Sequence, residues 1–206
     1  MQQLQQFVKA RGKKTTFHSS KLIFQAGEVP THFYLLEEGY VKIFQEAENG
    51  QAITLSFFKR GDFFGLAELF ANYSVHECSA TTLNGATFYA ISMAQLQQQL
   101  TVDPALWQLI SQLLAEKIIL KHQHILSLTN LSVAERLTQF LQQFALSKTN
   151  GELVVDIPLT HEEISYYTNC SRQKVTSYLN EWRKKGFISY ERGNIQIRQP
   201  DALWRC

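Results

Sequence analysis

The side chains best suited to recognising another molecule lie between residues 171 and 180. Arg172 can donate two parallel hydrogen bonds to a guanine edge, and Gln173 can pair with the donor and acceptor of adenine. On a helix these two side chains would share one polar face with Thr176, Ser177 and Asn180. Such a face suits the DNA major groove, which admits one α-helix.

A helix-turn-helix is the element that would present this face. Thr160 and Glu163 have capping-box spacing, which predicts a short helix beginning near His161. Ser171 is a suitable N-cap for a second helix, and Gly186 is a suitable stop. The expected buried stripe of the second helix is Val175, Tyr178, Leu179 and Trp182. An ordinary amphipathic hairpin is the alternative, but capping, turn, stripe and polar face all favour helix-turn-helix.

The second helix is also locally basic. Its last two turns contain Arg183, Lys184 and Lys185, and its first turn contains Lys174. Positive charges of this kind bind phosphates with little sequence preference. We therefore expect Arg172 and Gln173 to read bases. Secondary base or phosphate contacts are expected from Lys174, Thr176 and Ser177. Ser171 and Asn180 complete the set of candidate DNA-binding residues.

These motifs resemble the DNA-binding end of the Crp/Fnr family of bacterial transcription regulators. The resemblance rests on Leu-Thr-x-Glu-Glu-Ile from residue 159, Ser-Arg-x-x-Val from residue 171, Gly-Phe-Ile from residue 186 and Gly-Asn-Ile from residue 193. Segments 187–190 and 194–197 predict the hairpin of a winged helix. The family's best-known recognition helix has glutamate at the position of Gln173 and arginine at that of Ser177. Its usual half-site is therefore not expected, although a guanine opposite Arg172 is.

Composition sets broad limits on the class of protein. A chain of 206 residues with 45% apolar residues can bury one large core or two smaller ones. Residues 1–128 contain ten Lys and Arg against ten Asp and Glu, and residues 129–206 contain ten against eight, so the net charge of +2 lies in the second part. No membrane span or signal peptide is expected, which favours a cytoplasmic protein.

The segment from about residue 15 to residue 91 has the pattern of an antiparallel β sandwich or barrel. Short apolar runs at 22–24, 33–36, 41–44, 53–57, 80–82 and 87–91 alternate with turn signals. Gly27-Glu28, the Gly39 turn and Gly61-Asp-Phe-Phe-Gly65 resemble the cyclic-nucleotide-binding jelly roll of Crp/Fnr proteins. The expected fold is α+β, with a jelly-roll sensor domain (1–101), a dimerisation helix (102–129) and a winged helix-turn-helix (130–206).

The expected effector pocket lacks residues that the resemblance implies for cyclic nucleotides. Family members that bind them have a glutamate after the second glycine and an arginine-serine pair about twelve residues later. Here these positions hold Leu66 and Cys78-Ser79, and no Lys or Arg occurs between Arg60 and Lys117. A buried phosphodiester needs a cation or a cluster of amides, so we predict that cyclic AMP and cyclic GMP are not effectors. The candidate pocket residues are Phe64, Leu66, Glu68, Leu69, Cys78 and Ser79.

What else the pocket holds stays open at this point. Its aromatic and apolar content fits either an unidentified small hydrophobic effector or a filled barrel that binds nothing. His76 and Cys78 supply too few ligands for haem or a metal, and the clustered N-terminal cysteines of iron-sulfur relatives are absent. The three separated cysteines, which include Cys170 and Cys206, are expected to be free thiols. No cofactor is predicted.

A long helix is expected from Asp103 and Pro104 to about residue 128. The seven-residue repeat of Leu106, Leu113 and Leu120, with Ile110 inside it, favours a seam against a parallel partner helix. A second stripe is expected to pack on the protein's own barrel: Leu114, Ile118, Ile125 and Leu128. Two stripes favour a two-fold homodimer, and a helix buried on two sides within one chain is the alternative.

The connection into the C-terminal part lies at residues 130–136. Ser132 and Glu135 form another capping-box pattern, and residues 148–151 form a hairpin-type turn. By position alone, this turn could contact RNA polymerase, as a loop of activating relatives does. The competing function is a sensor module that acts through a protein partner. An enzyme is not expected, because no nucleophile elbow, metal-ligand spacing or phosphate-binding glycine loop occurs.

Overall fold

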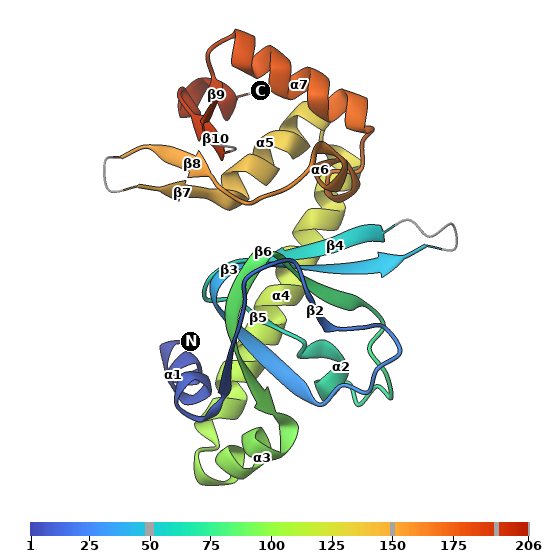
Figure 1. Ribbon diagram of the computed structural model, residues 1–206, viewed down its shortest axis with the longest axis vertical. Coiled ribbons are helices and arrows are strands. Elements are labelled where there is room, and N and C mark those ends of the chain that lie inside the picture. The colour runs from blue at the N-terminus through green and yellow to red at the C-terminus, as the bar shows by residue number, and fades with distance from the viewer. Residues whose placement is uncertain (48–51, 149–150, 192–193, 206) are drawn as a thin grey trace. The chain divides into compact units, whose positions relative to one another are not determined.

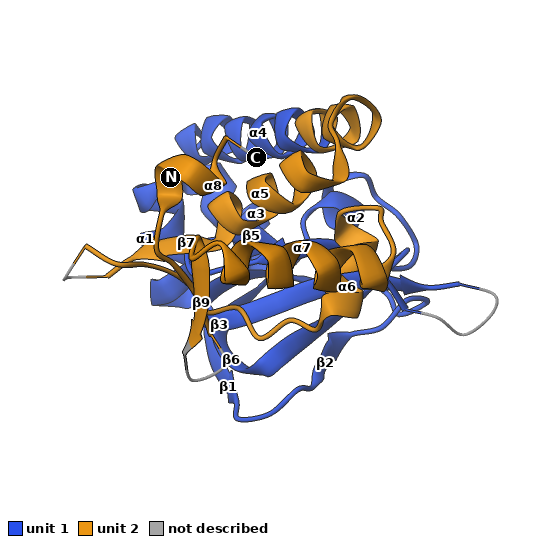
Figure 2. Ribbon diagram, turned by 90° about the horizontal axis from the view of Figure 1, so that it is seen from above, with its two compact units in different colours: residues 1–121 blue, residues 122–206 orange. Residues whose placement is uncertain are grey.

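The computed structural model describes residues 1–47, 52–148, 151–191 and 194–205. The chain folds into two compact units, residues 1–121 and 122–206 (Figure 2). Helix α4 (Ala105–Asn130) crosses the boundary and contributes to both units. None of the helices in the described ranges is long and apolar enough to cross a membrane.

Unit 1 is built on an antiparallel sheet whose strand order is β1-β6-β3-β4, with β2 paired to β6 and β5 paired to β3 (Figure 1). The strands are β1 (Lys13–Phe17), β2 (Leu22–Phe24), β3 (His32–Glu46), β4 (Ala52–Phe58), β5 (Phe63–Phe64) and β6 (Ser79–Ser92). This arrangement confirms the predicted antiparallel β domain.

Two of its strands are longer than the sequence pattern predicts. The runs 33–36 and 41–44 belong to the single strand β3, and the runs 80–82 and 87–91 belong to β6. Gly39 has a φ of 82° and lies at a register shift, so it bends the strand without ending it. A side chain at Gly39 would lie 2.6 Å from the carbonyl oxygen of Gly85, which shows how closely the two strands approach. The expected turn is therefore a bend.

Three helices of unit 1 were not expected: α1 (Gln2–Arg11), α2 (Ala67–Phe70) and α3 (Met93–Val102). Helix α3 begins with a capping box in which the Ser92 hydroxyl accepts from the Gln95 amide at 3.2 Å. Helices α1 and α3 bury leucines against one face of the sheet. Their core contains Leu4, Val8, Phe33, Leu35, Ile91, Leu96 and Leu100, together with Leu106, Ile110 and Leu113 of α4.

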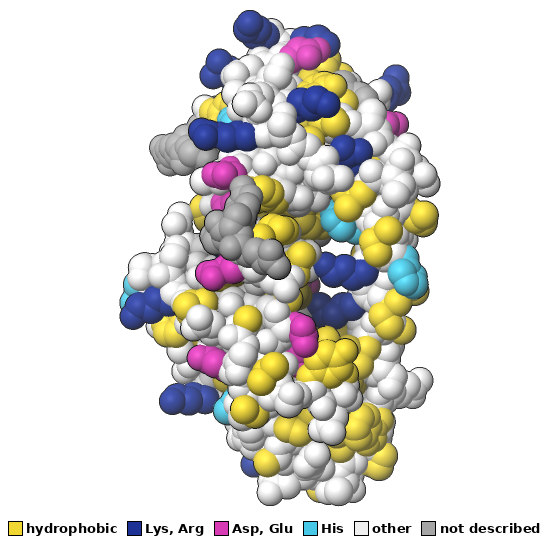
Figure 3. Space-filling model, turned by 90° about the vertical axis from the view of Figure 1, so that its right-hand side faces the viewer, with side chains coloured by type: hydrophobic (Ala, Val, Ile, Leu, Met, Phe, Trp, Pro, Cys, Tyr) yellow, Lys and Arg dark blue, Asp and Glu magenta, His cyan; other side chains and the backbone are white. Residues whose placement is uncertain are grey.

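This packing corrects the expected faces of α4. Leu106, Ile110 and Leu113 are buried in the core of their own unit, whereas Leu120 is 63% exposed. Ile118 and Ile125, which were expected to pack inward, are 55% and 57% exposed. The heptad spacing identified residues on one face but could not reveal that this face has partners in α1, α3 and the sheet. Figure 3 shows hydrophobic side chains at the surface of one face of the molecule.

The other face of the sheet encloses a second core in which four of the eight buried side chains are aromatic. Tyr34 stacks on Phe64 with 4.9 Å between ring centres, and Phe88 meets Tyr34 edge-on at 5.7 Å. The buried members of this core are Phe24, Tyr34, Leu36, Val41, Phe64, Ala80, Ala86 and Phe88. Aromatic side chains therefore occupy much of the barrel interior.

Unit 2 contains a small antiparallel sheet of order β7-β8-β10-β9 together with its helices. The elements are α5 (Val133–Phe144), β7 (Ala145–Ser147), β8 (Leu153–Val155), α6 (His161–Tyr167), α7 (Arg172–Lys184), β9 (Ile188–Glu191), β10 (Asn194–Ile197) and α8 (Pro200–Leu203). The pairing of β9 with β10 confirms the predicted wing. Thr149 and Asn150 of the predicted 148–151 turn, and Arg192 and Gly193 of the wing tip, lie outside the described residues.

Candidate nucleic-acid interface

The turn between α6 and α7 is built by local hydrogen bonds that the sequence predicts. The Thr160 hydroxyl accepts from the amide of Glu163 at 3.2 Å, and the Glu163 carboxylate accepts from the amide of Thr160 at 3.0 Å. Ser171 caps α7 by accepting from the amide of Lys174 at 3.3 Å. Between the helices, Asn169 adopts a left-handed φ of 48°. Both predicted helix starts are therefore confirmed.

The inner face of α7 fixes the helix on unit 2. Val175, Leu179 and Trp182 are fully buried, and Tyr178 is half-buried, as the predicted stripe requires. The helix ends at Lys184. Gly186, two residues later, has a φ of 74°, and the amide of Phe187 donates to the carbonyl of Trp182 at 2.9 Å. This left-handed closure satisfies the last carbonyls of the helix.

The outer face of α7 presents the predicted recognition residues. Arg172, Gln173, Lys174, Ser177 and the N-cap Ser171 are exposed. Thr176 and Asn180 are half-buried. A shallow surface hollow is lined by Arg172, Gln173, Thr176 and Ser177. Exposed donors at the first turn of a capped helix have the geometry that base-edge recognition requires.

Thr176 is less free to bind a base than the sequence suggests. Its hydroxyl donates to the carbonyl of Arg172 at 3.0 Å, and it lies 2.9 Å from Nδ1 of His161. With the hydroxyl proton directed at Arg172, His161 must be the donor of the second bond and therefore carries its proton on Nδ1. Burial, followed by the charge of Arg172, lowers the pKa of His161 below 6.5. His161 is thus a supporting residue that the sequence did not identify.

Arg136 on α5 is a second residue that sequence reasoning missed. Its Nε donates to the carbonyl of Thr168 at 2.7 Å, and its Nη2 donates to that of Asn169 at 3.1 Å. Nη1 donates to the carbonyl of Leu131 at 2.6 Å and, at 3.5 Å, to that of Leu128. One guanidinium therefore ties the turn of the helix-turn-helix to the end of α4 and the segment that precedes α5.

Part of the positive charge near α7 is neutralised within the protein. Lys185 pairs with Glu181 at 2.6 Å, and Arg198 lies 3.9 Å from Glu152. Arg183 and Lys184 are exposed at the end of the helix. The charge available for phosphates is therefore smaller than the residue count implies, although it still surrounds the recognition face.

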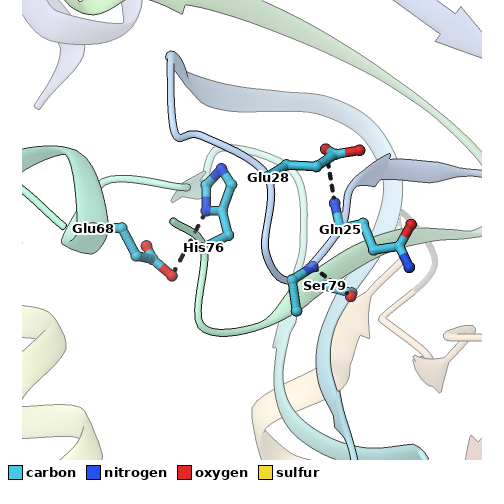
Figure 4. A network of polar contacts seen from close by, with 6 residues as sticks. Gln25, Glu28, Glu68, His76 and Ser79 are labelled. Atoms are coloured by element: carbon cyan, nitrogen blue, oxygen red, sulfur yellow. Dashed lines mark hydrogen bonds and ion pairs between the residues drawn. The ribbon is translucent and has the colours of Figure 1, made fainter. Parts of the chain in front are cut away.

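The structure does not bring all the candidate pocket residues of unit 1 around one space. Phe64 belongs to the aromatic core, whereas Leu66 and Leu69 pack with the helices on the opposite face of the sheet. Cys78 is half-buried, and burial, followed by the charges of Glu68 and Glu77, raises the pKa of its thiol. The buried Ser79 hydroxyl accepts from the amide of Ala26 at 3.0 Å (Figure 4).

Glu68 faces His76 in the same region. Its Oε1 lies 3.8 Å from Nδ1 of His76, which is too long for a hydrogen bond (Figure 4). The imidazole stacks on Phe24 with 3.9 Å between ring centres. Within the described residues, no group of three His, Cys, Asp or Glu side chains is arranged to hold a metal ion.

Two family models match the chain. The cyclic nucleotide-binding domain model matches residues 14–103, and the Crp-like helix-turn-helix domain model matches residues 135–206. The global nitrogen regulator of Nostoc sp. is 27% identical over 195 residues, which cover 92% of this chain and 87% of that protein. The cAMP-activated global transcriptional regulator CRP of Pasteurella multocida is 26% identical over 178 residues, or 84% of each chain.

Solved structures show the same fold. FixK2 from Bradyrhizobium japonicum superimposes with a TM-score of 0.82 at 17% identity, covering 94% of this chain and 96% of that one. The antiparallel β domain, the long helix and the winged helix-turn-helix therefore occur in one chain, in the order that the two family models describe. With both domain models matched and relatives of this kind across almost its full length, the chain belongs to the Crp/Fnr family of transcription regulators.

Proposed function

We propose that the protein controls transcription as a two-fold homodimer that binds an inverted-repeat operator through the first turn of α7. The observation that carries this proposal is the exposed polar face of a helix that is capped at Ser171 and anchored by Trp182. A two-fold dimer would place two such helices about 34 Å apart, one turn of B-DNA.

The dimer is supported by the part of α4 that its own unit leaves uncovered. Five large apolar side chains there are more than half exposed: Ile118, Ile119, Leu120, Ile125 and Leu126. Exposed apolar residues concentrated on one helix indicate an interface. A second copy of the same helix would bury them in a symmetric contact.

Arg172 and Gln173 are the proposed base readers. Their side chains are exposed, and no hydrogen bond or ion pair within the described part of the chain occupies them. Arg172 can bind O6 and N7 of a guanine, and Gln173 can bind N6 and N7 of an adenine. Lys174 and Ser177 would contact phosphates or neighbouring bases, whereas Thr176 positions the first turn.

The proposed regulator does not use cyclic AMP or cyclic GMP as its effector. Leu66, at the position where binding relatives have a glutamate, is buried in the core, and the Ser79 hydroxyl is engaged by the Ala26 amide. Aromatic rings occupy much of the barrel interior. A contact between residues 148–151 and RNA polymerase stays a prediction from position.

A sensor that acts only through a protein partner is the competing function. It would not require a capped helix with exposed base-reading side chains. Matched substitutions on α7 separate the two functions. Arg172→Ala removes a proposed base contact from the first turn, whereas Arg183→Ala removes an arginine from the last turn that is also exposed.

The test is equilibrium binding of these variants to a selected operator and to duplexes with a single base pair exchanged. Arg172→Ala should weaken binding by about 1–3 kcal/mol and abolish the preference at one base pair of each half-site. Arg183→Ala should weaken binding to all duplexes alike and reduce its salt dependence. Equal weakening by Arg172→Ala on every duplex would show that this residue reads no base, and no salt-sensitive DNA binding by the wild type would favour the protein-partner function.

A further inference from the structure

Two lysines of α4 bring their ammonium groups to the same strand of unit 1. Lys117 and Lys121 are one turn apart, and therefore lie on one face of the helix. The Lys121 ammonium donates to the carbonyl of Leu55 at 2.8 Å and to the Ser56 hydroxyl at 2.5 Å. The Lys117 ammonium lies 4.8 Å from the centre of the Phe58 ring. Both charges thus face β4.

In the part of the chain that the structure describes, neither charge has an acidic partner at contact distance. Among the described residues, no carboxylate lies within 4.0 Å of either ammonium. Asp62 acts on Lys117 only from farther away, and its own carboxylate accepts from the backbone amide of Lys59 at 2.8 Å. The partners of Lys121 are a neutral carbonyl and a neutral hydroxyl.

The surroundings of both lysines disfavour their charge. Burial lowers the pKa of Lys117, and the charge of Asp62 only partly opposes this effect. Burial also lowers the pKa of Lys121, and the neighbouring charge of Lys117 lowers it further. By accessible surface Lys117 is half-buried and Lys121 is exposed, so the unfavourable charge lies chiefly at Lys117. Two neighbouring like charges, one of them partly removed from water, destabilise the folded protein unless an anion neutralises them. Figure 3 shows lysine or arginine side chains lying inside a hollow of one face of the molecule.

We propose that Lys117 and Lys121 form a binding site for a small dianion, a phosphoryl group or a dicarboxylate. Two ammonium groups complement two negative charges, whereas a cyclic nucleotide carries only one on its phosphodiester. The sequence shows no Lys or Arg between Arg60 and Lys117, but α4 supplies the cations that this segment lacks.

The site lies where unit 1 ends. Lys121 is the last residue of unit 1, and α4 continues from it into unit 2. A bound anion would therefore contact the helix that leads to the DNA-binding unit. The inference goes beyond the proposed DNA-binding function, and its test uses no DNA, so failure of one does not imply failure of the other.

The experiment measures binding of sodium phosphate and of sodium succinate to the full-length protein at neutral pH, by calorimetry and by the shift in melting temperature. Sodium chloride at matched ionic strength is the reference for general salt effects. A saturable shift with phosphate alone identifies a phosphoryl site, and one with succinate alone identifies a dicarboxylate site. Saturation by both supports a general dianion site. No shift beyond that of sodium chloride with either anion overturns the proposal.

Two variants localise the effect. Lys117→Gln combined with Lys121→Gln should weaken anion binding at least tenfold. Lys21→Gln is the matched control, because that exposed lysine of the same unit also lies over an aromatic ring, 5.7 Å from the centre of Phe17. It should bind like the wild type. Unchanged binding by the double variant would overturn the assignment.

The melting temperature without anion gives a second, independent test. Removing two unneutralised charges should leave it unchanged or raise it at low salt, also in the single variant Lys117→Met. If Lys117 instead stabilised the fold through Asp62, Lys117→Met would lower the melting temperature, and this result would contradict the proposal. The single variant keeps the test valid even if the double variant does not fold.

Discussion

Replacing Arg136 by alanine should destabilise unit 2 more than any exposed charge of that unit. The guanidinium donates to the carbonyls of Leu131, Thr168 and Asn169 at 2.6, 2.7 and 3.1 Å. Each such bond contributes on the order of 1 kcal/mol net, so the loss of all three lowers the free energy of unfolding by about 3 kcal/mol. Arg136→Lys can replace at most part of this fork and should lose about 2 kcal/mol.

The assay is urea unfolding at fixed protein concentration, monitored by the fluorescence of the two tryptophans of unit 2, Trp182 and Trp204, in a Trp107→Phe background. Arg198→Ala is the control, because this exposed side chain donates from Nε to the Ser189 hydroxyl at 2.9 Å and lies 3.9 Å from Glu152, surface contacts whose loss should change stability by about 1 kcal/mol or less. If Arg136→Ala lost no more than Arg198→Ala, the guanidinium would not be holding the turn, and the reasoning would fail.

Three further predictions concern unit 1, the dimer and α6. Gly39→Ala places a Cβ atom 2.6 Å from the Gly85 carbonyl at a backbone φ of 82°, and should lower the free energy of unfolding in urea by more than about 2 kcal/mol. Gly27→Ala has a similar φ of 90° but open space around its Cβ atom, and should lower it by about 1 kcal/mol. Equal losses in the two variants would mean that the close approach of the strands at Gly39 does not matter. Ile118→Glu with Ile125→Glu should give folded monomers in sedimentation, and an intact dimer would place the interface elsewhere. Because the folded state lowers the pKa of His161 below 6.5, only the unfolded chain takes up this proton just below pH 6.5, and stability falls as the pH decreases through that value. His161→Gln should show a smaller fall over this range in urea unfolding, and an identical pH dependence would contradict the shift.

Local signals predicted the DNA-binding unit well. The capping boxes at Thr160 and Ser132, the N-cap at Ser171 and the glycine at 186 each act within a few residues, so their outcome is readable from the sequence. The stripe on α7 was confirmed for the same reason, because helical periodicity fixes which residues share a face.

Features that depend on distant partners could not be predicted in this way. The turn signal at Gly39 became a bend because β6 continues to pair with β3 on both sides of it. Heptad spacing placed Leu106 and Leu113 on one face of α4, but only the structure shows that α1 and α3 share the core with that face. Arg136 binds backbone carbonyls about 32 residues away, and no side-chain pattern marks such acceptors.

The most direct test of the central claim is selection of duplexes from a random DNA pool by the purified wild-type protein and by Arg172→Ala, without added ligand and then with cell extract. We predict that the wild type enriches an inverted repeat whose half-sites lie one helical turn apart and contain a guanine, and that Arg172→Ala loses the preference for that guanine. Enrichment of no sequence under either condition by a folded dimer would contradict the account.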